Sequence, residues 1–259
     1  MTAATTLPSV FLSHGSPLLP FEDIPARGFM AGLAKIWPRP GAILSVSAHW
    51  QLPAPTVSAA PAPETIHDFY GFPDELYRLR YPAPGAPALA HRVEALLRGV
   101  GLTCAVDPGR GLDHGAWNPL LLIYPAADIP VTQLSILSNG GPAAHLALGR
   151  ALVPLRQEGV LVLASGGVVH SLRQFHVDRE RPADWAVSFE RWLAQAIESG
   201  DEAAMLDYRA RPDGPLAHPT DDHILPLFVA LGAGAGVKGR ALHRGFAHGS
   251  LGMAAYAWE

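Results

Sequence analysis

The chain has 259 residues, a formal net charge of −4 and a hydrophobic fraction of 49%. This length and apolar content are enough for one large domain with a substantial core, so we expect residues 1–259 to form a single domain. The sequence has no basic block and no apolar run of bilayer length, which predicts neither a nucleic-acid partner nor a membrane-spanning helix.

The cysteine and histidine counts narrow the chemistry further. Cys104 is the single cysteine, so the sequence excludes an internal disulfide and a Cys-x-x-Cys metal knuckle. The first residues also lack the basic stretch and apolar core of a signal peptide, and both features favour a reduced, cytoplasmic setting. The 12 histidines are about twice the number expected by chance, which points to metal binding or proton transfer.

Short apolar runs alternate with amphipathic segments along most of the chain. In chain order they predict a strand at 9–13, a helix at 27–37, a strand at 42–48, a helix at 86–100, a strand at 103–106, a helix at 115–124, a strand at 131–136, a helix at 143–157, a strand at 160–164, helices at 185–199, 202–208 and 223–231, and final sheet segments at 240–246 and 252–258. Several strands are continuously apolar, which is typical of strands buried on both faces. We therefore expect an α/β fold with a central mixed sheet flanked by helices on both faces.

Histidines follow several of these apolar runs. His14, His49 and His170 come at or just after predicted strands, His114 lies in a Gly-bracketed loop, and His223 precedes an apolar helix. Ligands gather at the carboxyl ends of strands in such sheets, and a strand end is a rigid place from which to aim an imidazole. A catalytic transition metal needs about three protein ligands and open positions, so the sequence predicts a metal site at the strand carboxyl ends.

Six motifs in order carry a family resemblance. They are Phe11-Leu-Ser-His-Gly-Ser-Pro, Ser45-Val-Ser-Ala-His-Trp, Ile66-His-Asp-Phe-Tyr-Gly-Phe-Pro, Leu112-Asp-His-Gly-Ala-Trp, Ala164-Ser-Gly-Gly-Val-Val-His and His218-Pro-Thr-Asp-Asp-His-Ile-Leu-Pro-Leu. Together they resemble the 4,5-DOPA extradiol dioxygenase group, in the superfamily of the protocatechuate 4,5-dioxygenase catalytic subunit. The likeness runs from His14 nearly to the end of the chain.

The resemblance implies a role for each of the five histidines. It implies that His14, His49 and His223 bind one divalent metal. His170 matches a histidine beside the metal that is either a fourth ligand or the catalytic acid/base, and His114 matches a second catalytic histidine near the substrate.

The third ligand position departs from the protocatechuate branch, which uses two histidines and a glutamate. Here that position is His223, with the adjacent Asp222 as the alternative carboxylate ligand. A site of three histidines is more neutral and accepts Zn(II) as well as Fe(II), so both metals are compatible with the sequence.

The implied reaction joins O₂ to a small aromatic diol such as DOPA. Cleavage outside the diol, at the 4,5 bond, gives a muconate semialdehyde, with a neutral His170 exchanging protons with the catechol. His67, Tyr70 and Phe72 lie in an aromatic loop, which either covers the substrate ring or plugs the core. The sequence is also compatible with an oligomer.

Other functions fit parts of the same pattern. A zinc-dependent hydrolase would use the same histidines to activate water, and its turnover would not need O₂. A binding module that kept the pocket would purify without metal. Ser165 in Ala-Ser-Gly-Gly could indicate a serine nucleophile, but no Gly-x-Ser-x-Gly elbow is present.

Overall fold

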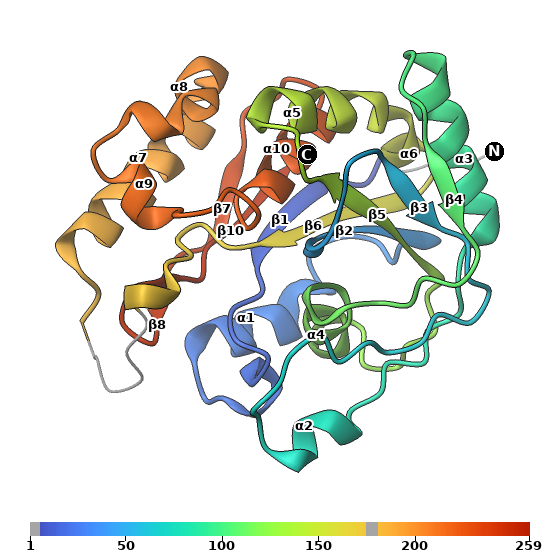
Figure 1. Ribbon diagram of the computed structural model, residues 1–259, viewed down its shortest axis with the longest axis horizontal. Helices are drawn as coiled ribbons and strands as arrows, with labels where there is room; N and C mark the ends of the chain where they lie inside the picture. The colour runs from blue at the N-terminus through green and yellow to red at the C-terminus, as the bar shows by residue number, and fades with distance from the viewer. Residues whose placement is uncertain (1–5, 175–180) are drawn as a thin grey trace.

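The computed structural model describes residues 6–174 and 181–259, and within these ranges its centre is an eight-stranded mixed sheet (Figure 1). The strand order is β4-β3-β5-β2-β6-β1-β10-β7, and β8 and β9 form a separate hairpin. The strands are β1 (Ser9–Ser13), β2 (Ala42–Leu52), β3 (Thr56–Ser58), β4 (Ala105–Asp107), β5 (Val131–Leu137), β6 (Val160–Gly166), β7 (Arg240–His243), β8 (Phe246–Ala247), β9 (Leu251–Gly252) and β10 (Ala255–Trp258).

Four neighbouring strands, β5, β2, β6 and β1, run parallel and form the middle of the sheet. β10 pairs antiparallel with β1 and with β7, and β3 pairs antiparallel with β5. The side chains of β1 and β6 are buried along their whole length, as expected of continuous apolar runs in a covered parallel sheet. The carboxyl ends of β1, β2 and β6 therefore meet at one edge.

Helices cover both faces of the sheet (Figure 1). One hydrophobic cluster packs α3, α5, α6, α7 and α10 against the sheet, and the other packs α1, α2 and α4. The helices are α1 (Pro25–Leu33), α2 (Asp74–Arg78), α3 (Pro87–Gly99), α4 (His114–Ile123), α5 (Pro142–Ala151), α6 (Val153–Gln157), α7 (Asp184–Ser199), α8 (Glu202–Leu206), α9 (Gly214–Ala217) and α10 (Leu225–Ala233), with 3-10 turns η1 (Leu19–Phe21), η2 (Leu172–Gln174) and η3 (Tyr208–Ala210). This arrangement confirms the predicted α/β fold class.

Some predicted elements have different bounds. The helix expected at 143–157 is two helices, α5 and α6, because the chain turns at Leu152 and Pro154 lies in the first turn of the second helix, where a proline is tolerated. The helix expected from 223 begins at Leu225, so His223 precedes it. β3 and α2, which are only 3 and 5 residues long, were not predicted.

β2 continues past its predicted end at residue 48 and contains His49. Its pairing with β5 shifts between Val46 and Gln51: these residues are five apart, whereas their partners Leu134 and Ile136 are two apart. The extra residues form a bulge, which redirects side chains where the regular ladder stops. His49 lies in this bulge, at the edge where β1 and β6 also end.

Gly166 at the end of β6 allows a close backbone approach. A Cβ at this position would lie 2.1 Å from the carbonyl oxygen of His223, whereas a Cβ on Gly28 in α1 would meet nothing within 4 Å. We expect Gly166→Ala to lower the free energy of unfolding by about 1–3 kcal/mol. The control Gly28→Ala should raise it by about 0.5–1 kcal/mol, because alanine suits a helix interior better. Urea unfolding measures both, and equal stability of the two variants would contradict the close approach.

Candidate metal centre

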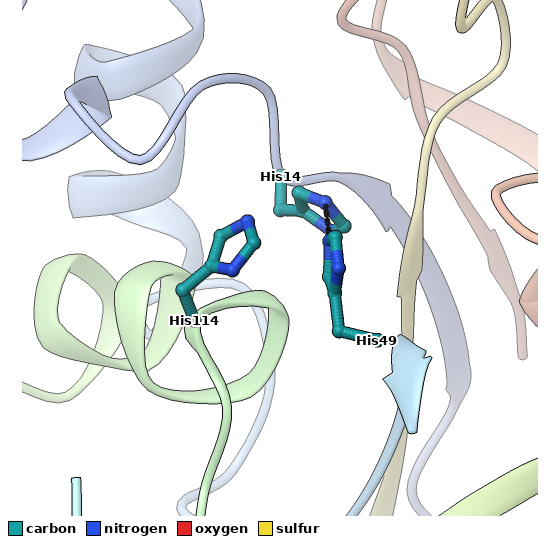
Figure 2. Close-up of side chains that lie close together, drawn as sticks. All are labelled: His14, His49 and His114. Atoms are coloured by element: carbon teal, nitrogen blue, oxygen red, sulfur yellow. Dashed lines mark hydrogen bonds between the residues drawn. The ribbon is translucent and has the colours of Figure 1, made fainter. Parts of the chain in front are cut away.

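The five predicted histidines come together at the carboxyl edge of the parallel strands. His14 follows β1, His49 lies in the β2 bulge and His170 follows β6, while His114 is the first residue of α4 and His223 stands before α10. Figure 2 shows three of them, with His14 and His49 facing each other and His114 reaching in from its helix. Residues separated by up to 209 positions in the sequence thus share one site.

The imidazole rings are in mutual contact. The ring centroid of His49 lies 4.9 Å from that of His14, 4.9 Å from that of His223 and 4.0 Å from that of His114. The rings of His14 and His223 are 5.3 Å apart. Nε2 of His49 and Nε2 of His14 lie 3.0 Å apart.

An oxygen atom faces the Nδ1 atom of each predicted ligand. The Ser165 hydroxyl donates to the carbonyl of Gly115 (2.5 Å), so it accepts from Nδ1–H of His14 at 2.9 Å. Nδ1–H of His223 donates to the Asp222 carboxylate. With the proton on Nδ1, the Nε2 lone pair of each ring is free to bind a metal.

The third predicted ligand, His49, also has an oxygen atom opposite its Nδ1, but at a longer distance. Nδ1 of His49 lies 3.7 Å from Oδ2 of Asp68. The same carboxylate oxygen lies 3.0 Å from Nδ1 of His114. Carboxylates in this position commonly orient metal-binding imidazoles from behind.

Burial keeps the rings of His14, His49 and His223 neutral. It lowers the pKa of His49 to about 3, and burial together with the neighbouring imidazoles holds the pKa values of His14 and His223 well below the ordinary range. Burial also lowers the pKa of His170, against the opposing effect of Asp222. Burial by itself would raise the pKa of Asp68, but its contacts with His114 and His49 outweigh this and hold it at about 2.

This donor set fits a divalent metal. Nε2 of His14 and Nε2 of His49 face each other at 3.0 Å, and with the proton of each ring on Nδ1 their lone pairs would point at one shared position that a cation can fill. Two nitrogens bound to one ion at about 2.1 Å would be about 3.0–3.4 Å apart at ordinary ligand angles. Candidate ligand atoms of His14, His49 and His114 lie within 4.8 Å of one another, and so do those of His170, Asp222 and His223.

The aromatic residues of the predicted substrate loop differ in their contacts and exposure. The His67 ring contacts Phe69, Tyr77 and Trp117, and Phe72 packs on Phe69. Tyr70 is 92% exposed. From this loop, the ring that contacts the imidazole cluster is Phe69, whose centroid lies 5.6 Å from that of His114, so substrate binding by His67, Tyr70 and Phe72 stays a prediction.

Three oxygen partners of the cluster were not predicted as site residues: Ser165, Asp222 in its supporting position, and Asp68. The sequence indicates Ser165 only as a candidate nucleophile and Asp222 only as an alternative ligand, whereas each accepts from a histidine Nδ1–H. The sequence signal that could have predicted a supporting carboxylate is the position of Asp222 next to His223. No local pattern connects Asp68 to His49 or His114, because the loop that carries it has no regular period.

Acid should destabilise the protein through His218, which lies behind the cluster. Its Nε2–H donates to the carbonyl of Val168 at 2.9 Å, and burial lowers its pKa to about 3. The unfolded chain, with a histidine pKa near 6.5, therefore binds more protons between pH 6.5 and 3. The free energy of unfolding should fall as pH falls through this window, by up to about 1.4 kcal/mol per pH unit for each such histidine.

Urea unfolding at several pH values measures this dependence. His218→Gln should give a shallower slope than the parent protein below pH 6.5. The exposed His91 in α3 provides the control, because His91→Ala should leave the slope unchanged. An identical slope in His218→Gln would contradict the assignment.

Among the described residues, no helix combines the length and apolarity needed to cross a bilayer.

Comparison with known proteins identifies the family. A family model described as the catalytic LigB subunit of aromatic ring-opening dioxygenase matches residues 9–258. A protein named 4,5-DOPA dioxygenase extradiol from Portulaca grandiflora is 44% identical, over 96% of this chain and 94% of its own length.

A protein of the same name from Escherichia coli K12 is 42% identical, over 97% of this chain and 94% of its own length. The crystal structure of an uncharacterized protein from Escherichia coli K12 superimposes with a TM-score of 0.83 at 35% identity, covering 98% of this chain and all of the other. These matches favour ring opening over the hydrolase and binding-module hypotheses. The chain therefore belongs to the LigB family of aromatic ring-opening dioxygenases, and it is an extradiol ring-cleaving enzyme that uses a divalent metal.

Proposed function

We propose that this enzyme opens the ring of a catechol of the DOPA type at the 4,5 bond and gives a muconate semialdehyde. The substrate class is taken from the names of its relatives. The observation that carries the proposal is the convergence of buried, neutral imidazoles whose Nδ1 atoms face oxygen partners. This leaves Nε2 atoms from distant parts of the chain available for one metal.

We propose His14, His49 and His223 as the ligands. In each of them Nδ1 faces an oxygen of Ser165, Asp68 or Asp222. Three neutral ligands suit Zn(II) as well as Fe(II), and we propose Fe(II) as the active metal because oxygen chemistry needs a redox-active ion. When bound, Fe(II) supplies the electron transfer that lets triplet O₂ react with a singlet aromatic ring.

His170 is proposed as the acid/base and not as a fourth ligand. Its ring stacks on that of His223 with centroids 3.4 Å apart and an interplanar angle of 6°. The lone pair of an imidazole nitrogen lies in the ring plane, so two nearly parallel, stacked rings do not aim their lone pairs at one point. His223 would therefore hold the metal, and His170 would keep a ring nitrogen free to take a proton.

The lowered pKa of His170 suits this role. At neutral pH the ring is unprotonated, so it can accept a proton from a catechol hydroxyl and later return it to the opened product. His114, which lies 5.4 Å from His14 between ring centroids, is proposed as a second hydrogen-bonding group for the substrate. Phe69 packs edge-on against His114 and would help to exclude water from this side.

Oxygen consumption tests the proposal. Protein loaded anaerobically with Fe(II) and mixed with DOPA in air should consume one O₂ per ring and develop the yellow colour of a semialdehyde. The Zn(II)-loaded protein is the control and should consume none. Absence of O₂ uptake across a panel of catechols with the Fe(II) form would overturn the proposed substrate class.

A further inference from the structure

Asp68 lies where the aromatic loop meets the imidazole cluster. Its Oδ1 accepts the backbone N–H of His114 at 2.9 Å. Its Oδ2 lies 3.0 Å from Nδ1 of His114 and 3.7 Å from Nδ1 of His49. One side chain, 21% exposed, thus faces one backbone N–H and two imidazole nitrogens from two different elements, α4 and β2.

We propose that Asp68 is a positioning residue: its carboxylate fixes the Nδ1–H tautomer of His114 and docks the aromatic loop, residues 64–72, over the imidazole cluster. The proposal rests on the proposed function only for the catalytic importance of His114. The tautomer and the docking concern this chain alone.

The negative charge of Asp68 matters because several nitrogen atoms face its two oxygens. An ionised carboxylate only accepts, and its two oxygens offer about four lone-pair sites. It can therefore receive the His114 backbone N–H on Oδ1 and ring N–H groups on Oδ2. An asparagine has one acceptor oxygen. If that oxygen keeps the backbone N–H, the amide NH₂ faces the ring and favours a bare Nδ1 on His114.

Among the described residues, Nδ1 of His114 has no hydrogen-bond partner of good geometry, and the carboxylate oxygen that it faces at 3.0 Å is Oδ2 of Asp68, in a contact tilted from the ideal. A tilted contact at 3.0 Å still separates the two tautomers, because a bare Nδ1 would place its lone pair against a carboxylate oxygen. Electrostatic repulsion would then disfavour that form.

The loop is fixed on both sides of Asp68. Before it, the backbone of Ile66 donates to Leu112, and the indole N–H of Trp117 donates to the carbonyl of Ile66. After it, Phe69 contacts the rings of His114 and Trp117. Asp68 is therefore the charged contact in a seam that joins the loop to the first turns of α4.

A purely structural role as a helix cap is the competing explanation. The N-cap position of α4 already belongs to Asp113, whose side chain accepts from the backbone N–H of Ala116. A second cap at His114 needs only one acceptor, which asparagine supplies as well as aspartate. Asp68→Asn therefore distinguishes positioning from capping.

The decisive measurement is the histidine tautomer in the metal-free protein. With ¹⁵N-labelled histidine, long-range ¹H–¹⁵N NMR correlations show which ring nitrogen carries the proton, and the His114→Gln variant assigns the signal. We expect Nδ1–H for His114 in the parent protein and Nε2–H in Asp68→Asn. Asp74→Asn, an exposed carboxylate at the start of α2, is the matched control and should leave the pattern unchanged.

Kinetics of the Fe(II)-loaded protein provide the second readout. Loss of a correctly oriented His114 should lower kcat per bound Fe(II) in Asp68→Asn by about 10²-fold or more, with KM for DOPA changed less than about threefold. Asp68→Glu keeps the carboxylate and should recover part of kcat, whereas Asp68→Ala should not.

The outcomes separate cleanly. Nε2–H on His114 in the parent protein overturns the proposal, and this holds even if Asp68→Asn fails to fold. An unchanged tautomer and kcat in a folded Asp68→Asn also overturns it, in favour of capping. Failure of the parent protein to open any catechol would overturn the proposed function and leave the tautomer result standing.

Discussion

Removal of His223 should abolish both metal binding and ring opening. Its Nε2 is free because Nδ1 is bonded to Asp222, and its ring is almost fully buried among the other imidazoles. His223→Ala should therefore lose nearly all of its bound Fe(II), with O₂ consumption reduced by more than about 10³-fold, since loss of a supporting residue already costs about 10–100-fold in metal affinity. Elemental analysis after anaerobic Fe(II) loading and an oxygen electrode measure the two effects.

His114→Ala is the informative partner variant. Ligand atoms of His14, His49 and His114 also lie within 4.8 Å of one another, so a rival ligand set would include His114 in place of His223. The proposed set predicts that His114→Ala keeps its metal, and the rival set predicts the reverse. His91→Ala on the exposed side of α3 should behave like the parent protein in both assays.

Replacement of His170 should separate proton transfer from metal binding. Because its ring is parallel to that of His223, we expect His170→Gln to keep a full complement of Fe(II). General acid–base catalysis is worth about 10²–10⁴-fold in rate, so kcat should fall by that factor. Metal content and steady-state O₂ uptake, measured on the same preparation, test this directly.

The pH dependence of kcat tests the proton-transfer role of His170. The pKa of His170 is lowered by burial, so its base form is present at neutral pH and is lost only as pH falls below the ordinary histidine range. The kcat of the parent protein should therefore decline as the pH falls, and the kcat of His170→Gln should not show this decline. Loss of Fe(II) from His170→Gln would instead identify the ring as a fourth ligand.

The sequence predicted those elements that have a strong local pattern. The apolar run at 9–13 is β1 with the same bounds, and the amphipathic helix predicted at 86–100 is α3 at Pro87–Gly99. The sequence does not predict the break at Leu152, because the apolar pattern continues across it, although Pro154 lies in the first turn of a new helix. β3 was missed because three residues cannot establish a period.

The candidate site was predicted in outline for a similar reason. His14 and His170 follow buried strands, and the alternation of strands and helices indicates that such ends meet. The position of His49 inside a bulge depends on the register between β2 and β5, which only the folded sheet defines. The contact of Asp68 with His49 and His114 joins a loop to two distant elements, and no spacing in the sequence encodes it.

The position of β10 has a consequence for biosynthesis. β1, which leads directly into His14, is hydrogen-bonded between β6 and β10, and the backbone N–H of Ser13 donates to the carbonyl of Ala254. A ribosome makes β10 long after β1, because more than 200 residues separate the two strands. The strand that leads into His14 therefore lacks one of its two neighbours until β10 has left the exit tunnel.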